Sequence, residues 1–293
     1  MRAVFIGEGM LELSRHGSVW KLGYGGDTLN TAIHLARAGI ETSYFTALGS
    51  DTYSKTLKRQ WRAEGLDISL VLSDPQRHAG LYAIDTDDHG ERSFTYWRET
   101  SAARAMFSCA GIEEALAQAA QADLVGFSLI TLAILPAEGR DKLMKLCQSV
   151  RARGGRVAFD GNYRPRLWTS IEEARRARDL AISVADIGLP TLEDEASLSG
   201  ETDSKQVSAH WSRLGCLETL VKLGVEGCLL PDGSLLPPPK VLNPVDTSGA
   251  GDAFNGGYLA ARLLGYGIHE AALEGHKVAG WCVMRQGAIP PRD

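Results

Sequence analysis

The stretch NPVDTSGAGDAFNGGY, residues 243–258, places a turn-forming segment directly before a run of small and apolar residues. Glycine and serine favour a tight turn. From Ala253 to Leu264 the apolar residues recur at helical spacing, and Gly265 is a typical ending signal. The stretch therefore predicts a helix over 251–265 that begins at a glycine-rich turn.

A helix that begins in this way can bind an anion. The first backbone N–H groups of a helix lack partners within it and carry a partial positive charge, and glycines let a phosphate approach them closely. Gly249, Ala250 and Gly251 supply such groups, and Asp252 follows in the first turn. A carboxylate there can also merely complement the helix dipole. The glycine spacing fits neither a Walker A nor a dinucleotide-binding motif, so from these residues alone both interpretations stay open.

Outward from this stretch, short apolar runs alternate with helical patterns. Runs with strand character lie at 3–7, 42–48, 124–129, 156–160, 186–190, 219–223 and 228–231. Helical patterns lie at 111–122 and 136–155, and another is capped by Asp27 and stopped by Gly39. Because the apolar runs lack strict alternation, they favour a mainly parallel sheet covered by helices on both faces. We predict an α/β fold that forms a single domain over 1–293.

The stretch GLYAIDTDDHGERSFTYWR, residues 80–98, breaks this alternation. Two aromatic strands flank the turn DTDDHGE without a helix between them, which is a hairpin signal. We predict an antiparallel β lid, mainly residues 78–98, added to the α/β body. On its second strand Phe94, Tyr96 and Arg98 share one face. The alternative at this stage is a surface hairpin whose arginine is solvated.

Composition limits the classes of function. The chain has 293 residues, 44% of them hydrophobic and 23% charged, with a formal net charge of −5, as in ordinary soluble globular proteins. The densest basic run, RRAR at 175–178, follows two glutamates on a predicted helix, so we expect no nucleic-acid partner. Five scattered cysteines and seven histidines show no metal-ligand spacing, which predicts no protein-held metal and no disulfide framework.

The N-terminus lacks the features of a signal peptide. The longest apolar stretch, residues 124–137, is shorter than the roughly 20 residues that a membrane span requires. A buried strand running into a loop explains it better. We therefore expect a cytoplasmic protein without membrane contact.

Two motifs together resemble a known family. VDTSGAGDAFNGGYLAAR (245–262) is similar to the C-terminal signature of the ribokinase-type (PfkB) sugar kinases, and GYGGDTLNTAIHLARAG (23–39) to their N-terminal signature. The similarity covers essentially the whole chain. It implies a ribokinase-like three-layer sandwich with a small lid, and an ATP-dependent sugar kinase that uses Mg²⁺ and in some members a monovalent cation. Lids of this family often pair between subunits, which implies a homo-oligomer formed through the lid.

The resemblance implies catalytic and ATP-binding roles. Asp252 becomes the base that takes the proton of the sugar hydroxyl, and the N–H groups of Gly249, Ala250 and Gly251 form the anion hole for the transferring phosphoryl group. VKLGVEG (221–227) resembles the nucleotide-contacting segment. The residues implied at ATP are Asn162, Arg164, Lys222, Gly224, Glu226, Gly227, Gly249 and Gly251.

Two parts of the family pattern stay ambiguous. Asp246 and Thr247 resemble residues around a phosphate or cation site, but capping of the loop explains them equally well. The family also has an N-x-x-E motif that helps to hold magnesium. This chain has LEDE, with Leu192 at the asparagine position, so the outer-shell role of Glu195 is left open.

The sugar side is implied by further stretches. GEGMLEL (7–13), FDGNYRPRLW (159–168) and QGAIPPRD (286–293) resemble the 2-keto-3-deoxygluconate kinase branch, which implies phosphorylation of 2-dehydro-3-deoxy-D-gluconate at its 6-hydroxyl. An arginine suits the carboxylate of such a sugar acid. The residues implied at the substrate are Gly26, Asp27, Asn30, Tyr82, Tyr96, Arg98, Arg164 and Asp252. A fructokinase or ribokinase is one alternative and a non-catalytic sugar-acid sensor another, although an intact GAGD stretch speaks against a sensor.

Overall fold

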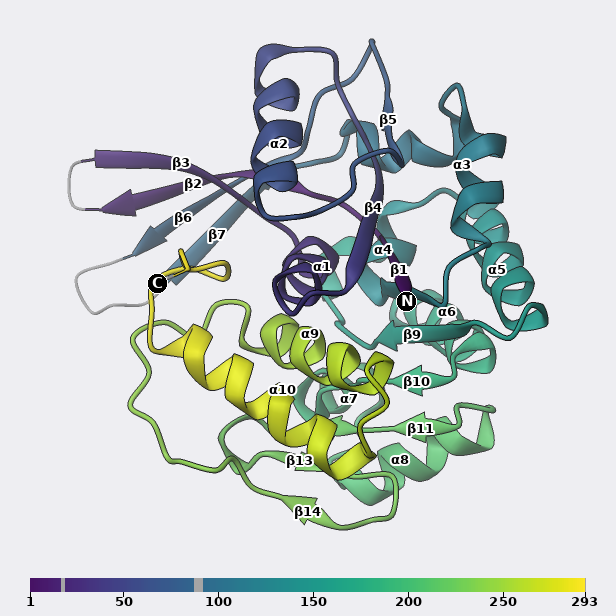
Figure 1. Cartoon of the computed structure of the whole chain (residues 1–293), viewed down its shortest axis with the longest axis vertical. Coiled ribbons are helices and arrows are strands. Elements are labelled where there is room, and N and C mark those ends of the chain that lie inside the picture. The colour runs from purple at the N-terminus through teal and green to yellow at the C-terminus, as the bar shows by residue number, and fades with distance from the viewer. Residues whose placement is uncertain (17–18, 87–91, 293) are drawn as a thin grey trace.

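A parallel sheet forms the centre of the molecule (Figure 1). The computed structural model describes residues 1–16, 19–86 and 92–292. Within these residues the central sheet has seven strands, all paired in parallel. Their order is β11 (Glu218–Thr219), β10 (Ile187–Gly188), β9 (Arg156–Asp160), β8 (Leu124–Ser128), β1 (Arg2–Ile6), β4 (Glu41–Leu48) and β5 (Val71–Ser73). The predicted mainly parallel sheet is confirmed.

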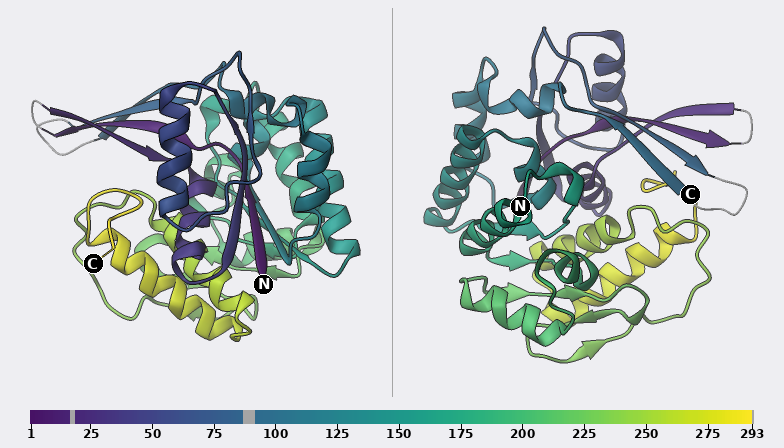
Figure 2. Two further views of the ribbon diagram at one scale, coloured as in Figure 1. Left: turned by 45° about the horizontal axis from the view of Figure 1, so that its top comes forward. Right: turned by 180° about the vertical axis from the view of Figure 1, so that it is seen from behind.

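Helices cover both faces of this sheet, as the two further views in Figure 2 show. One layer contains α1 (Asp27–Arg37), α2 (Thr52–Ala63), α9 (Ala250–Leu263) and α10 (Ile268–Val283). The other contains α3 (Ile112–Ala119), α4 (Leu129–Ile134), α5 (Ala137–Ala152), α6 (Ile171–Val184), α7 (Leu192–Ser199) and α8 (Ser204–Arg213). Short 3₁₀ turns lie at Ala102–Ser108, Pro165–Leu167 and Gly224–Glu226. The predicted three-layer α/β sandwich is therefore present.

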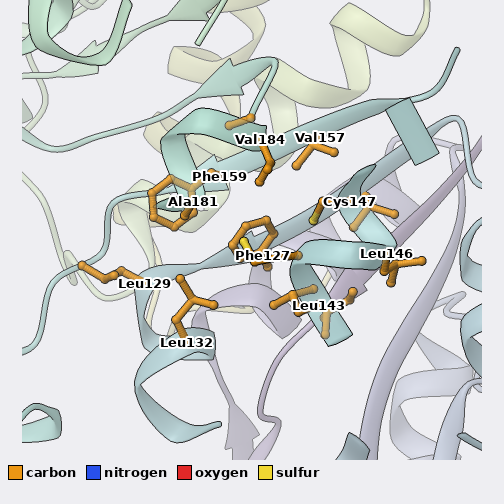
Figure 3. Packing of buried hydrophobic residues seen from close by; sticks show 14 of the residues in the cluster. Phe127, Leu129, Leu132, Leu143, Leu146, Cys147, Val157, Phe159, Ala181 and Val184 are labelled. Carbon is orange, nitrogen blue, oxygen red and sulfur yellow. The ribbon is translucent and has the colours of Figure 1, made fainter. Parts of the chain in front are cut away.

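The inner strands are mostly apolar because each of their faces packs on a helical layer. On β1, Val4 and Ile6 belong to one hydrophobic cluster, whereas Ala3 and Phe5 belong to the other. Successive side chains of a strand point to opposite faces, so a strand buried on both sides needs apolar residues at every position. Figure 3 shows one of these clusters, with side chains from β8 and β9 packed against α5 and α6.

The lid is a separate small sheet that projects from one side of the body (Figures 1 and 2). Its strands run in the order β3 (Val19–Gly25), β2 (Met10–His16), β6 (Leu81–Thr86) and β7 (Arg92–Trp97). Each hairpin is antiparallel, and β2 pairs with β6 in parallel. The predicted hairpin at 78–98 is confirmed, although residues 87–91 of its turn lie outside the described residues. The sequence did not predict that residues 10–25 form the other half.

A third small sheet joins β12 (Val221–Lys222), β13 (Cys228–Leu229) and β14 (Leu235–Leu236) in antiparallel order. In addition, the apolar stretch 124–137 contains β8 followed by the short helix α4, where a loop was expected after the strand. None of the helices in the described ranges combines the length and apolar character that a membrane crossing requires.

The two helix starts that matter for function differ in how they begin. Asp27 does not cap α1, because Gly26 occupies the capping position and Asp27 lies within the first turn. A side chain at Gly26 would overlap the carbonyl oxygen of Glu8, so the glycine is needed for this close approach. The predicted helix at 251–265 is confirmed as α9, and it begins at Gly249, whose φ of 68° is left-handed.

Candidate active site

Asp252 lies in the first turn of α9, where α1 packs beside it. Its carboxylate is buried and accepts a hydrogen bond from Asn30 Nδ2 at 2.8 Å. Thr31 Oγ1 donates to the backbone carbonyl of Asp252 at 3.4 Å. The N-terminal and C-terminal signatures thus meet at this carboxylate, with α1 fixing its position.

Asp27 lies near Asp252 and affects its charge. Burial raises the pKa of the Asp252 carboxyl to about 8, and the negative charge of Asp27 acts in the same direction, while the hydrogen bond from Asn30 opposes both. Burial also raises the pKa of Asp27, against a hydrogen bond with Ser128. A carboxylate whose pKa is close to the working pH is well matched to general-base chemistry, which supports the role predicted for Asp252.

The raised pKa of Asp252 predicts a pH dependence. If Asp252 acts as a base, kcat/KM should rise as the pH passes through about 8 and then level off, because only the ionised form accepts a proton. Stability should change in the opposite sense. A carboxyl whose folded pKa lies above its unfolded value of 3.8 stabilises fully below that value, and this contribution is lost as the pH rises through about 8. A pH–rate profile beside melting temperatures checks both, and a rate that stays flat from about pH 5 to 9 would contradict the assignment.

The glycine turn before α9 has the donors that an anion requires. The N–H groups of Gly249 and Gly251 make no hydrogen bond within the described residues, but that of Ala250 donates to the Thr247 carbonyl at 3.3 Å. An anion would have to compete with this long bond for the Ala250 donor. The described structure thus presents Gly249 and Gly251 as ready donors.

Hydrogen bonds of the Asp246 side chain hold the loop that precedes this turn. Asp246 Oδ1 accepts from Ser248 N at 2.8 Å, and its Oδ2 accepts from Gly287 N at 2.8 Å. A Cβ on Gly249 would lie 2.5 Å from the Cβ of Ala288. The loop-capping interpretation of Asp246 is supported by these contacts, and the turn packs directly on the segment 286–290.

Lys222 forms a closed polar triangle beside the glycine turn. Its Nζ donates to Asp160 Oδ1 at 3.1 Å and to Asn255 Oδ1 at 3.2 Å, and Asn255 Nδ2 donates to Asp160 Oδ2 at 2.9 Å. A Cβ on Gly251 would lie 3.7 Å from the Lys222 ammonium. The lysine therefore brings a buried positive charge to the predicted phosphate end of the site.

A small cavity lies between the triangle and α1. Its volume is about 10 Å³, and Asp27, Ser128, Asp160 and Asn255 contribute polar groups to its wall. A space of this size with several polar partners suits about one water molecule. Residues of both signature segments, such as Asp27 and Asn255, line it.

The other residues predicted at ATP do not all lie together. Gly224 and Gly227 form the turn between β12 and β13 with φ values of 61° and 101°, and Glu226 is exposed. Asn162 Nδ2 instead donates to Asp27 Oδ2 at 3.2 Å, which places Asn162 on the predicted sugar side. Arg164 is half exposed and pairs with Asp194 at 3.2 Å.

The lid brings its predicted substrate residues together. The rings of Tyr82 and Tyr96 stack with centroids 5.9 Å apart, and the Arg98 guanidinium lies 5.8 Å from the centroid of Tyr96. The Tyr82 hydroxyl donates to Glu12 of β2. Arg98 is buried and paired with Glu8, so the alternative of a solvated arginine does not hold.

Glu195 does not fit the outer-shell magnesium role of the family motif. Its Oε2 accepts from Arg178 Nη1 at 2.6 Å and its Oε1 from Trp211 Nε1 at 3.0 Å, all within the packing of α6, α7 and α8. The carboxylate is only 3% exposed. Across 1–16, 19–86 and 92–292, no group of three or more His, Cys, Asp or Glu side chains could hold a metal ion.

The comparison with protein families identifies the class of enzyme. The model of the pfkB family carbohydrate kinases matches residues 6–293. The chain belongs to this family of carbohydrate kinases. The resemblance noted in the sequence is confirmed.

This pfkB kinase has relatives of similar length. It is 41% identical to the 2-dehydro-3-deoxygluconokinase of Escherichia coli strain K12, over 98% of this chain and 96% of the relative. The protein of the same name from Dickeya dadantii strain 3937 is 40% identical over the same shares. Among solved structures, the PfkB protein from Polaromonas sp. JS666 matches with a TM-score of 0.85 at 28% identity, over 98% of this chain and 97% of that one.

Four site residues of this pfkB kinase were not predicted from the sequence: Glu8, Glu12, Asp160 and Asn255. Asp160 stands at the carboxyl end of a parallel strand, where ligands of open α/β sheets bind, and this position could have singled it out. Asn255 is a polar residue on the buried face of α9, which is a second such signal. Glu8 and Glu12 gave no local signal, because their partners lie about seventy residues or more away in the sequence.

Proposed function

We propose that this pfkB kinase transfers the γ-phosphoryl group of ATP to the 6-hydroxyl of 2-dehydro-3-deoxy-D-gluconate, giving 2-dehydro-3-deoxy-6-phospho-D-gluconate. The observation that carries the proposal is the buried Asp252 at a glycine-turn helix start, near the lid residue Tyr82, together with the buried Arg98 at the base of the lid. Identity of about 40% over nearly the whole length to relatives of that name supports the choice of substrate.

Asp252 is proposed as the base. Its carboxylate takes the proton of the 6-hydroxyl while the oxygen attacks the γ-phosphorus, and the bond to the ADP oxygen breaks. Asn30 orients the carboxylate through its 2.8 Å hydrogen bond. The Asn30 Oδ1 atom is buried and has no partner among the described residues, so a substrate hydroxyl could satisfy it.

The phosphate end is proposed to neutralise charge. The N–H groups of Gly249 and Gly251, with that of Ala250 once released, would accept the transferring group, and Lys222 adds a positive charge next to them. Mg²⁺ bound with ATP supplies further positive charge to the phosphates. We assign it no direct protein ligand, since Glu195 is committed to Arg178 and Trp211. A monovalent cation remains an expectation from the family resemblance.

The substrate end is proposed to recognise an acid. Arg98 and the stacked Tyr82 and Tyr96 offer a cation and two phenol groups on one side of the lid, which suits a carboxylate and hydroxyls better than a neutral sugar alone. We place Gly26, Asp27 and Asn162 at the same end, since Asn162 donates to Asp27 and the charge of Asp27 acts on Tyr96, and Arg164 would bridge the acid and the ATP phosphates. A family fructokinase or ribokinase has no need of the buried arginine, and a sensor has no need of a base.

A coupled assay of ADP release over a panel of acceptors tests the proposal. We expect kcat/KM for 2-dehydro-3-deoxy-D-gluconate to exceed that for ribose or fructose by at least about a hundredfold, because only the acid satisfies the arginine. Faster turnover of ribose or fructose would overturn the choice of substrate, while ATP binding without any turnover would favour the sensor.

The assembly and location of the enzyme are further proposals. The lid exposes large apolar side chains at Val19, Trp20, Leu22 and Trp97. Exposed apolar side chains of this kind suit a second copy of the chain, so we propose a homo-oligomer that pairs through the lid. We also propose that the chain acts as one catalytic domain and that it works in the cytoplasm. Light scattering of the wild type and of Trp20→Ser would test the pairing, since an unchanged mass would contradict it.

A further inference from the structure

A buried ion pair joins the lid to the body at the base of the lid. Glu8 follows β1 of the central sheet, and Arg98 follows β7 of the lid. The residues are 2% and 5% exposed. Arg98 Nε donates to Glu8 Oε2 at 2.8 Å, and Arg98 Nη2 contacts the same oxygen. This pair is a buried charge contact between the central body and the end of the strand that carries Tyr96.

We propose that Glu8 is a positioning residue that holds the guanidinium of Arg98 for the substrate carboxylate. The inference rests on the proposed function, because it assumes that the substrate is an acid. Glu8 would touch neither substrate nor ATP, and would act only through Arg98.

The geometry of the guanidinium supports this role. A guanidinium presents five N–H donors in a planar fork, so its separate edges can serve two carboxylates. Glu8 lies against the edge formed by Nε and Nη2: Nε donates to it, and Nη2 is in ion contact with it without a hydrogen bond. Nη1 makes no hydrogen bond within the described residues, and the group lies against the ring of Tyr96. Glu8 therefore leaves one edge of Arg98 for a second anion.

The surroundings of Glu8 fix it firmly. A Cβ on Gly80 would lie 2.6 Å from Glu8 Oε1, and a side chain on Gly26 would overlap the Glu8 carbonyl oxygen. These two glycines close around the glutamate, and Gly26 itself starts the helix that carries Asn30. Glu8 Oε1 is buried without a partner, which is costly for a carboxylate oxygen.

The charges around Arg98 also support a positioning role for Glu8. A buried arginine without a counter-ion is unfavourable, and in this site it would be drawn toward the carboxylate of Asp27, whose pKa Arg98 already lowers against the effect of burial. Glu8 supplies the counter-ion from outside the sugar site. Arg98 thus stays in place while the site is empty.

Glu8→Gln tests the inference, since it keeps the shape of the side chain and removes its charge. We expect KM for 2-dehydro-3-deoxy-D-gluconate to rise about tenfold or more, with KM for ATP within about twofold of the wild type. In an Arg98→Ala background the same change should add little, because the residue through which Glu8 acts is gone. If Glu8→Gln does not fold, Glu8→Asp takes its place in the experiment. The shorter aspartate keeps the negative charge but moves it away from the Arg98 guanidinium.

Glu218→Gln is the matched control. It breaks another buried ion pair, in which Glu218 Oε2 accepts from Arg262 Nη2 at 2.6 Å at the other end of α9. It should lower the melting temperature without changing the ratio of the two KM values. The inference is overturned if Glu8→Gln behaves like this control, or if its effect persists in full without Arg98. A wild type that does not phosphorylate the acid would instead refute the proposed function.

Discussion

Asp252→Asn should lower kcat by at least about a hundredfold while the KM values for the acid and for ATP change little. The asparagine keeps an oxygen for the 2.8 Å hydrogen bond from Asn30, so the local structure should survive. What it loses is the ability to accept the hydroxyl proton. Steady-state kinetics with calorimetric binding of both substrates would separate the two effects.

The same variant should be more stable than the wild type at alkaline pH. Ionising Asp252 costs stability because its pKa is raised to about 8 in the folded protein, and the amide cannot ionise. Asp246→Asn is the control: it is also buried but anchors the loop at Ser248 and Gly287, so it should lose stability instead. Retention of turnover by Asp252→Asn would remove Asp252 from the chemistry.

Lys222→Met should cost about 3 kcal/mol of unfolding free energy and also slow the reaction. The methionine fills similar space but leaves the largely buried carboxylate of Asp160 without its 3.1 Å cation partner. It also removes the positive charge beside Gly251, where we propose that the phosphoryl group binds. Urea denaturation would measure the first effect, and kcat the second.

Two further variants make this prediction specific. Adding Asp160→Asn to Lys222→Met should recover part of the stability but not the rate, because it removes the uncompensated charge without restoring the cation. Lys277→Met removes an exposed lysine paired with Glu274 and should change stability by less than about 0.5 kcal/mol. If Lys222→Met proved as stable as Lys277→Met, the buried triangle would not be a stabilising unit.

The fold was predictable from the sequence because its signals are local. Inner strands such as β8 are apolar at successive positions, and the glycine turn before the apolar run 253–264 indicates the start of α9. The second hairpin of the lid, β2 with β3, was missed although it is local. Its place beside the first hairpin could not be predicted, for the opposite reason. The strand MLELSRH (10–16) pairs in parallel with residues 81–86, and a pairing over that separation leaves no trace in either segment.

The residues of the site could be predicted from the sequence only where they belong to a motif. The motifs placed Asp252, Asn30 and the glycine turn, and the structure brings these together. They did not predict the hydrogen bond from Asn162 to Asp27, because that contact depends on how the end of β9 and the start of α1 lie in space. Partners such as Glu8 for Arg98 follow from packing alone.

The place of β1 in the sheet has a consequence for how the chain folds. Its five residues, the second to the sixth, lie between β4 and β8. The β8 partner, Leu124–Ser128, is synthesised more than a hundred residues later. During translation the first apolar strand therefore waits, unpaired on one side, for a neighbour that has not yet left the ribosome. Pairing between segments so far apart in the sequence slows folding. It also lengthens the time during which an exposed apolar strand can bind chaperones or aggregate.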